Sequence, residues 1–451
     1  MTLRDRLLIS TLHHIERDAY FEPSAKNLFE GAMQGMMATL SEEYEDDYSM
    51  YIPPSSQTDY LDRHFNRYEG LGFSLGFHEE SPGEYGEDRE EKKGSKKKFF
   101  INYPFYESPV YRACLRSGDQ ILQINGTLIA DKTPEEVMEL LKPPEQSEVL
   151  LTVLPFGQTE SKDFIVRREK IQSDSIEGDY FHADKRIFCL ETMPKIGYIR
   201  ITSFRGATTA NEFGNALDSM MQSGAESLIL DLRDNGGGDV WECVQIARML
   251  MSPKPDLGNV PDSGNVIVTV RNRNGFRRSL VLSEEKQRCT LPMVVLINGD
   301  TASASEFLTV ALQDHRRASI VGNRSFGKGV GQGIFGLPFQ SGLLSLTDWE
   351  YRRPNGKAIH RKKYAADSDD WGVIPDKIVE ISDAEKLAVM EYRSLRSNVI
   401  SPQRLAVLEQ FRQQMIKQKA KEQNGEFRFT GTAPYYDVQL DEAIKTLTHT
   451  P

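Results

Sequence analysis

Hydrophobic positions along this chain of 451 residues recur with two spacings, and the changes of spacing divide the chain into segments. On either side of Pro23, apolar residues recur every three or four positions, which predicts two amphipathic helices. The methionines in the second helix are more typical of a core or a subunit interface than of a ligand groove. From Glu69 the pattern changes to short strands, and from Ile171 strands alternate with helices.

After Asp383 the pattern is again helical and charged. Its narrow apolar stripe suits packing on the body of the protein or on a partner subunit. The stripe consists of Leu405, Leu408, Phe411, Met415, Leu440, Ala443, Ile444 and Leu447.

The middle of the chain predicts strand–turn–helix units of an α/β protein. Ser227–Arg233 is a continuous apolar run of the kind found in buried parallel strands. Met293–Ile297 is a second apolar run, and a small polar turn separates it from an amphipathic segment that carries Phe307 and Leu308 on one face. Asp239 and Glu242 have the spacing of a helix-capping pair.

The turn before the helix that carries Phe307 and Leu308 contains Ser303. The Ser303 hydroxyl would lie beside the partly positive N-terminus of that helix. A nucleophilic serine needs a base, but His315 would lie on the same helix and His360 lies in a polar stretch. Lys328 is flanked by glycines that allow close approach. Lowering a lysine pKa from about 10.4 to about 7 requires roughly 4.6 kcal/mol, which burial can supply. An ordinary turn serine and a solvated lysine are the alternative.

Two segments resemble the signature of the carboxyl-terminal processing peptidases, the tail-specific family of serine peptidases. They are Thr301–Glu306, with the sequence TASASE, and Phe326–Gly329, with the sequence FGKG. The resemblance implies that Ser303 is the nucleophile, Lys328 the general base, and Gln332 the group that orients the lysine. It also implies a crotonase-like α/β serine-protease core.

The same resemblance extends to a triglycine segment after the first buried strand. By itself, Gly236–Gly238 is either a tight connection or a source of unhindered backbone N–H groups. The resemblance to the family's oxyanion loop implies that Gly237 and Ala304 donate the two N–H groups, with the choice among the three glycines left open. Asp314 also matches a family position, but we interpret it as a structural hydrogen-bond or ion-pair partner.

A second resemblance covers the strand-rich segment. The sequence Gly70, Leu71, Gly72, Phe73, the run from Ala113 to Gly126, and a helix at Pro134–Leu141 together resemble a PDZ domain. Glycines in such a loop expose N–H groups that can hold the terminal carboxylate of a peptide, while the peptide adds as a strand to the sheet.

Two departures from the PDZ pattern stand out. Cys114 occupies a place where glycine is usual, and a charged insertion runs from Glu79 to Lys98. We expect a solvated hairpin tip at the insertion.

Composition adds few constraints. The net charge of -11 gives no indication of a nucleic-acid partner. No apolar run reaches the roughly 18 residues of a membrane span, and we find no signal peptide. The resemblance nevertheless favours a periplasmic or other extracytoplasmic location, with a protein that stays inside the cell as the alternative. Four scattered cysteines (Cys114, Cys189, Cys243 and Cys289) are interpreted as small buried hydrophobes, and we expect neither a metal nor another cofactor.

Together these observations predict an N-terminal helical segment (1–65), a PDZ-like domain (66–168), a catalytic core (169–382) and a C-terminal helical segment (383–451). The predicted function is that of a serine endopeptidase that recognises and processes protein C-termini. Its partners would be protein or peptide substrates with accessible C-termini, and its terminal helices are compatible with a homo-oligomer. One alternative is a non-catalytic PDZ-type scaffold.

A more remote alternative is a P-loop nucleotide hydrolase, because Gly322–Lys328 fits the first seven positions of that motif. Gly329 follows the lysine where a P-loop has serine or threonine.

Overall fold

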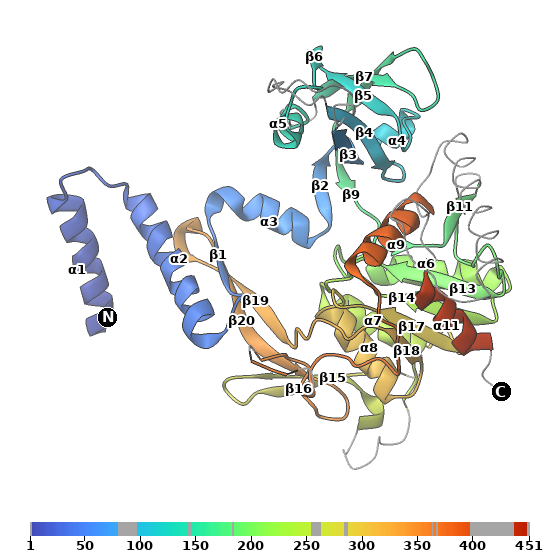
Figure 1. Cartoon of the computed structure of the whole chain (residues 1–451). Coiled ribbons are helices and arrows are strands. Elements are labelled where there is room, and N and C mark those ends of the chain that lie inside the picture. The colour runs from blue at the N-terminus through green and yellow to red at the C-terminus, as the bar shows by residue number, and fades with distance from the viewer. Residues whose placement is uncertain are drawn as a thin grey trace, which may run out of the picture.

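The computed structural model describes residues 2–79, 97–142, 147–182, 185–253, 263–283, 287–362, 364–366, 369–396 and 437–448. Figure 1 shows a central α/β body, a strand-rich module beside it, and two N-terminal helices that extend away from the body. Most of the insertion from Glu79 to Lys98 lies outside the described residues, as do Leu405, Leu408, Phe411 and Met415 of the C-terminal stripe.

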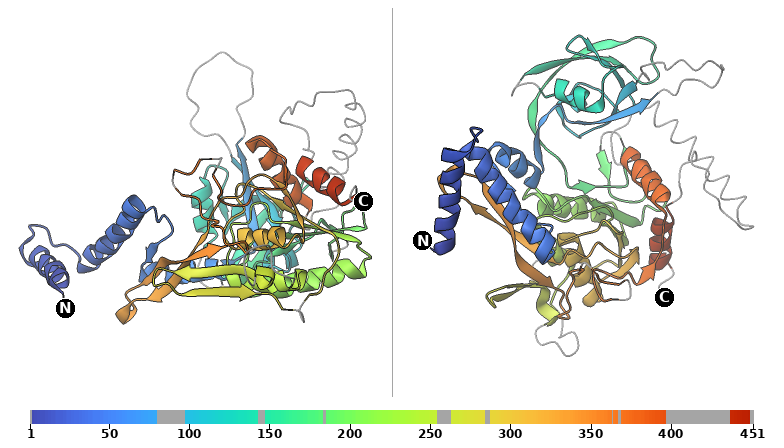
Figure 2. Two further views of the ribbon diagram at one scale, coloured as in Figure 1. Left: turned by 90° about the horizontal axis from the view of Figure 1, so that it is seen from below. Right: turned by 60° about the vertical axis from the view of Figure 1, so that its left-hand side comes forward.

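The predicted N-terminal helices are α1 (Leu3–Asp18) and α2 (Ala25–Tyr44). Ser24 caps α2, which ends at Glu45 in a left-handed conformation. Both helices extend away from the body in Figure 1 and in the left view of Figure 2. Met33 is buried whereas Met36 is exposed, so the chain by itself covers only part of the methionine stripe.

The segment after α2 returns to the body through β1 (Met50–Ile52), a short 3-10 helix (Pro54–Ser56) and α3 (Gln57–His64). Strand β1 pairs antiparallel with β20 (Leu343–Arg352), with Met50 opposite Ser345. This pairing attaches the N-terminal segment to a sheet of the order β1-β20-β15-β16, in which β19 also pairs with β20. The other strands of this sheet are β15 (Val266–Asn272), β16 (Arg277–Val281) and β19 (Val330–Gly336).

The strand-rich module is an antiparallel sheet of the order β3-β4-β5-β7-β8, with β6 on β5. Its core includes the fully buried residues Phe99, Ile101, Leu115 and Val137. A two-stranded ribbon of β2 (Arg67–Gly70) and β9 (Glu169–Gln172) leads into and out of the module. Its other elements are β3 (Phe73–Glu79), β4 (Lys97–Pro104), α4 (Pro109–Arg112), β5 (Gln120–Ile124), β6 (Thr127–Leu128), α5 (Pro134–Leu140), β7 (Glu148–Leu154) and β8 (Lys162–Arg167).

Cys114 shows how the module forms its turn without the usual glycine. Its backbone adopts a φ of 61°, in the left-handed region, directly after α4. Non-glycine residues adopt this conformation at some steric cost. Cys114 is also exposed, so the prediction of a buried cysteine is wrong here, whereas it is confirmed for the other three.

The body is built on a six-stranded sheet of the order β10-β13-β14-β17-β18-β21, parallel from β13 to β21. Its central strands are β13 (Ile196–Ile201), β14 (Ser227–Asp231), β17 (Met293–Ile297) and β18 (Ser319–Gly322). The edges are β10 (Ile176–Glu177) and β21 (Lys377–Ile378), and a hairpin of β11 (Tyr180–His182) and β12 (Lys185–Ile187) lies outside the sheet. The predicted buried parallel strands are therefore present.

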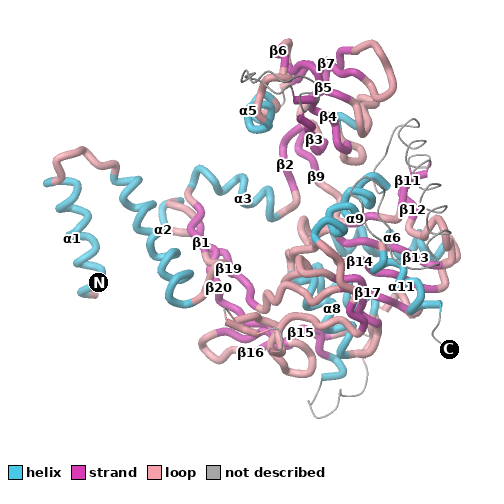
Figure 3. Tube along the Cα trace, in the orientation of Figure 1, coloured by secondary structure: helices cyan, strands magenta, loops and turns pink. Residues whose placement is uncertain are grey.

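Different helices cover the two faces of this sheet (Figure 3). On one face, Leu230 and Val295 belong to the core formed with α6 (Thr209–Gln222), α7 (Val240–Leu250) and α8 (Ala304–Asp314). On the other face, Ile229, Val294 and Leu296 share a second core with Ala443 of α11 (Val438–Thr448). Successive strand residues point to opposite faces, so the apolar strand sequence requires cover on both sides.

The C-terminal helices are also held by buried charges. Arg393 of α9 (Asp383–Arg396) forms ion pairs with Asp231 and Asp234, and Arg233 pairs with Asp231 and with Asp437. Breaking such a pair would leave an uncompensated charge in the interior, which is destabilising. Among the described residues, no helix combines the length and apolarity required to cross a membrane.

Candidate active site

Ser303 lies in a strained turn between β17 and α8. It is the N-cap residue of α8, with φ 56° and ψ -121°. A non-glycine residue in such a conformation stores about 1–3 kcal/mol and persists only when its surroundings hold it. Two bonds to the neighbouring segment hold this turn: the Thr301 hydroxyl donates to the Leu232 carbonyl at 2.8 Å, and the Ala302 N–H donates to the Asn235 carbonyl at 3.0 Å.

The triglycine segment lies directly against this turn. A Cβ atom at Gly237, where φ is 93°, would lie 2.7 Å from Ser303 Cβ and 2.9 Å from the Ala304 nitrogen. Glycine is therefore required there by contact as well as by conformation. The structure thus brings Gly237 and Ala304 beside Ser303, as the sequence predicted for the oxyanion loop.

The availability of the two N–H groups differs. Within the described part of the chain, we find no hydrogen bond from the Ala304 N–H. The Gly237 N–H instead donates to Asn235 Oδ1 at 2.9 Å. A substrate oxygen would have to compete with Asn235 or use a neighbouring glycine, so the identity of the glycine donor stays a prediction.

Lys328 lies in a partly buried setting on the loop between β18 and β19. Its Nζ donates to Gln332 Oε1 at 2.9 Å and lies 4.4 Å from the centre of the Tyr48 ring. Burial lowers the pKa of Lys328, as does the positive charge of Arg205, while Asp46 and Glu306 act in the opposite direction. The net lowered pKa makes a neutral, proton-accepting amine easier to form.

Glu306 joins the serine turn to the lysine loop and was not among the predicted site residues. Its carboxylate accepts from the N–H groups of Ser303 (2.8 Å), Gly327 (2.7 Å) and Lys328 (2.7 Å), and from the Ser325 hydroxyl (2.5 Å). Burial raises the pKa of Glu306 to about 7, and these four donors oppose the shift. The spacing of Ser303 and Glu306, which matches a capping box, is the signal that could have identified it.

Two further predictions concerned acidic residues. Asp314 accepts hydrogen bonds from both Arg353 and Asn355, which confirms a structural role. The predicted capping pair is only half right. Asp239 caps α7 through the Trp241 N–H, but Glu242 accepts from the Ala210 N–H at 2.7 Å, because a buried amide of α6 faces it.

The P-loop alternative is wrong. The segment from Gly322 to Lys328 leads into strand β19 and not into a helix. A P-loop requires a helix N-terminus to receive the phosphates. In the described ranges, no cluster of three or more His, Cys, Asp or Glu residues could hold a metal ion.

The predicted carboxylate loop of the strand-rich module connects β2 to β3. Gly72 has a φ of 87°, and its carbonyl accepts from the Phe105 N–H and the Ser108 hydroxyl, both at 2.8 Å. The Leu71 carbonyl accepts from the Val110 N–H at 3.0 Å. We find no hydrogen bond from the N–H groups of Leu71 and Gly72 to any described residue. The loop is therefore fixed through its carbonyls, with these two N–H groups left for a ligand.

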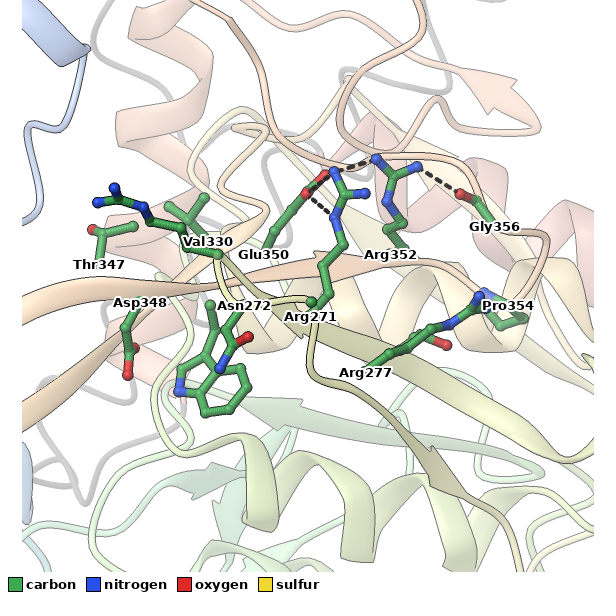
Figure 4. A pocket seen from close by; sticks show the side chains of 14 residues that line it. Arg271, Asn272, Arg277, Val330, Thr347, Asp348, Glu350, Arg352, Pro354 and Gly356 are labelled. Carbon is green, nitrogen blue, oxygen red and sulfur yellow. Dashed lines mark hydrogen bonds and ion pairs between the residues drawn. The ribbon is translucent and has the colours of Figure 1, made fainter.

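A groove of about 850 Å³ lies along the second sheet (Figure 4). Val330 of β19 and Thr347 of β20 line part of the groove. The groove therefore adjoins the strand that contains Gln332 and the strand whose Thr347 accepts a hydrogen bond from Gln332. Glu350 bridges Arg271 and Arg352 within the groove. Arg273 and Arg277 also line it and give the groove a basic character.

Comparisons with known proteins agree with this geometry. Residues 195–379 match the profile of Peptidase family S41, and residues 63–154 match that of the PDZ domain. A carboxyl-terminal-processing protease of Synechocystis is 33% identical over 280 residues, covering 62% of this chain and 58% of that protein. The carboxy-terminal processing protease CtpA of Bacillus subtilis is 27% identical over 378 residues, covering 84% of this chain and 69% of that protein.

Among solved structures, the "Putative S41 protease from Bacteroides fragilis NCTC 9343" shares the fold. Its TM-score is 0.51 at 16% identity, and the match covers 85% of this chain and 92% of that chain. The mixed α/β fold with a PDZ module is therefore confirmed.

Proposed function

We propose that this chain is a serine endopeptidase of peptidase family S41 that recognises and processes protein C-termini, because residues 195–379 match the profile of that family and residues 63–154 match that of the PDZ domain. Ser303 is the nucleophile, Lys328 the general base and Gln332 the residue that orients the lysine. The observation that carries the proposal is that Glu306 binds the backbone of both Ser303 and Lys328, which fixes nucleophile and base on one support.

The acylation step follows from these groups. Neutral Lys328 takes the proton of the Ser303 hydroxyl as Oγ attacks the scissile carbonyl carbon, and the carbonyl electron pair moves onto the oxygen. The Ala304 N–H and one glycine N–H of Gly236–Gly238 stabilise that oxyanion. When the tetrahedral intermediate collapses, the C–N bond breaks and the ammonium of Lys328 gives its proton to the leaving amine.

Deacylation repeats the sequence with water. Lys328, neutral again, takes a proton from a water molecule that attacks the acyl ester, and the proton returns to the Ser303 oxygen as the C–O bond breaks. The products are a new C-terminal carboxylic acid and the free serine. These steps use the side chains and backbone of this chain alone.

Substrate recognition is assigned to the PDZ domain. The free N–H groups of Leu71 and Gly72 support a role for Gly70–Phe73 in holding a terminal carboxylate. Substrates would therefore be proteins or peptides with accessible C-termini. We also propose the domain boundaries given above, and a homo-oligomer formed through the projecting terminal helices.

The test is mass spectrometry of an unfolded protein after incubation with this chain. We expect internal cleavage by the wild type and none by Ser303→Ala or Lys328→Ala. Lys357→Ala is the matched control, because Lys357 is an exposed lysine paired with Asp370 at 2.6 Å. Residual activity above a tenth of wild type in a folded Ser303→Ala protein would contradict the assignment, since truncation of a nucleophile removes far more.

A further inference from the structure

A chain of three hydrogen bonds connects the proposed base to the N-terminal segment. Lys328 Nζ donates to Gln332 Oε1 at 2.9 Å, and Gln332 Nε2 donates to Thr347 Oγ1 at 3.0 Å. The Thr347 hydroxyl in turn donates a hydrogen bond to Asp46 Oδ1 at 2.8 Å. These three hydrogen bonds therefore connect the amine of Lys328 to the carboxylate of Asp46, about 280 residues away in the sequence.

The carboxylate at the end of the chain decides the direction of every bond in it. An ionised carboxylate only accepts hydrogen bonds, so Thr347 has to donate its single hydroxyl proton to Asp46. The hydroxyl oxygen can then only accept from Gln332, which forces the NH2 group of the amide toward Thr347. The amide oxygen consequently faces Lys328, and the reversed orientation of the Gln332 side chain is excluded.

The position of Asp46 is itself well determined. Besides Thr347, its carboxylate accepts from the N–H groups of Tyr48 (3.2 Å) and Ser49 (3.1 Å) and from the Ser49 hydroxyl (2.5 Å). The Ser49 oxygen accepts from the Thr347 N–H at 2.9 Å, which ties the two segments together. Residues 46–49 thus form a turn between α2 and β1 that is anchored on β20.

We propose that Asp46 and Thr347 are positioning residues of the active site, which act through Gln332 to direct the Lys328 amine. The proposal rests on the proposed function only in taking Lys328 as the base. A neutral amine has one lone pair, and if one N–H is bound to Gln332 Oε1, rotation of the amine about the Cε–Nζ bond is restricted. The lone pair is then available for the serine proton.

The charged and titratable groups around Lys328 determine what a change at Asp46 does to its proton affinity. Arg205 lowers the pKa of Lys328, whereas Asp46 and Glu306 raise it. Tyr48 offers the face of its ring to the amine, and His360 packs against that ring with 6.4 Å between ring centres. Removing the negative charge of Asp46 should therefore lower the pKa of Lys328 further.

The variants separate orientation from charge. Thr347→Val removes the hydroxyl and keeps the charge of Asp46, so we expect kcat to fall about 10- to 100-fold with little change in KM, as when a group that orients a catalytic ligand is lost. Thr347→Ser retains a hydroxyl and should restore most of kcat. Asp46→Asn retains an acceptor oxygen but loses the charge, so the rising limb of the pH–rate profile should move to lower pH.

Asp47→Asn is the matched control, since it removes the same charge one position away, where the side chain is exposed and does not contact Thr347. Asp47→Asn should leave kcat unchanged, and the rising limb of the pH–rate profile should stay at the same pH. Thermal unfolding of each variant shows whether it is folded. A folded Thr347→Val protein with wild-type kcat, or an Asp46→Asn profile that does not move, would overturn the proposal.

Direct titration of Lys328 by NMR, with lysine labelled at 13Cε and Lys328→Arg to identify the signal, gives a readout that does not depend on catalysis. A lower Lys328 pKa in Asp46→Asn supports the positioning role even if no substrate is cleaved. If the wild-type protein does not cleave substrate at all, the proposed peptidase function is contradicted. Failure of the proposed function can therefore be distinguished from failure of the positioning role of Asp46 and Thr347.

Discussion

The backbone N–H groups of Ser303 and Lys328 donate to the same carboxylate oxygen, Oε2 of Glu306. The second oxygen, Oε1, accepts from Ser325 and Gly327. Both oxygens of one buried side chain are therefore needed as acceptors. This requirement distinguishes a carboxylate from an amide of the same shape.

Glu306→Gln should destabilise the protein by about 1–3 kcal/mol, because even in its better orientation the new NH2 group faces the Gly327 N–H, and one unsatisfied buried group costs about that much; the Ser325 hydroxyl beside it can reverse its role. Chemical denaturation measures the loss. Glu212→Gln is the control: its two oxygens accept from the Ser175 N–H and from the Thr208 hydroxyl, which can reverse its role. Equal stability of the two variants would show that the shared carboxylate does not organise the site.

The stability that Glu306 contributes should also depend on pH. Its folded pKa of about 7 lies above the ordinary value of 4.5, so the folded state binds the proton more tightly than the unfolded state. The contribution is complete below about pH 4.5 and is lost as the pH rises toward 7. The difference in unfolding free energy between wild type and Glu306→Gln should therefore shrink over this range. A difference that grows with pH would contradict the raised pKa.

Gly237→Ala should abolish peptidase activity, because the new methyl group would lie 2.7 Å from Ser303 Cβ. Gly236→Ala is the matched control, since a Cβ there meets nothing within 4 Å and its φ is not positive. Cleavage of one peptide substrate by both folded variants gives the comparison. Similar activities of the two variants would mean that the contact between Gly237 and Ser303 does not matter for cleavage.

Peptidase activity on a fixed substrate should rise with pH, because the proposed base, Lys328, can accept a proton only when its amine is neutral, and its lowered pKa makes the neutral amine easier to form. Lys328→Arg should be inactive, since a guanidinium does not give up its proton. Initial rates between pH 5 and 9 measure the profile. A maximum in acid followed by a fall through neutrality would indicate carboxylate chemistry instead.

A peptide with an amidated C-terminus should bind the PDZ domain about 10- to 150-fold more weakly than the free acid, which corresponds to about 1.5–3 kcal/mol for hydrogen bonds to a charged group. The Ser303→Ala protein allows this measurement by fluorescence anisotropy, because it should not cleave the peptide. The acid with a blocked N-terminus serves as the control. Equal affinities would place selection outside Gly70–Phe73.

The strand–turn–helix unit around Ser303 was predictable because both of its signals are local: an apolar run and an amphipathic helix separated by a small turn. Lys328 and Gln332 could be proposed from the sequence because their spacing matches the signature. Asp46 and Thr347 could not, since their contact depends on the pairing of β1 with β20 across about 300 residues. No local pattern encodes that pairing. Glu242 was misjudged for a similar reason, because the amide that it binds belongs to another helix.

The second face of the body sheet has a consequence for biosynthesis. Ile229, Val294 and Leu296 lack part of their cover until α11 (Val438–Thr448) has been made and packs against them. Apolar surface on the strand that leads to Ser303 therefore cannot be fully buried while the chain is still growing. A ribosome-bound chain that already contains every residue of the proposed catalytic set would still lack the helix that completes the core. This second core of the sheet is therefore completed only after translation has passed residue 448.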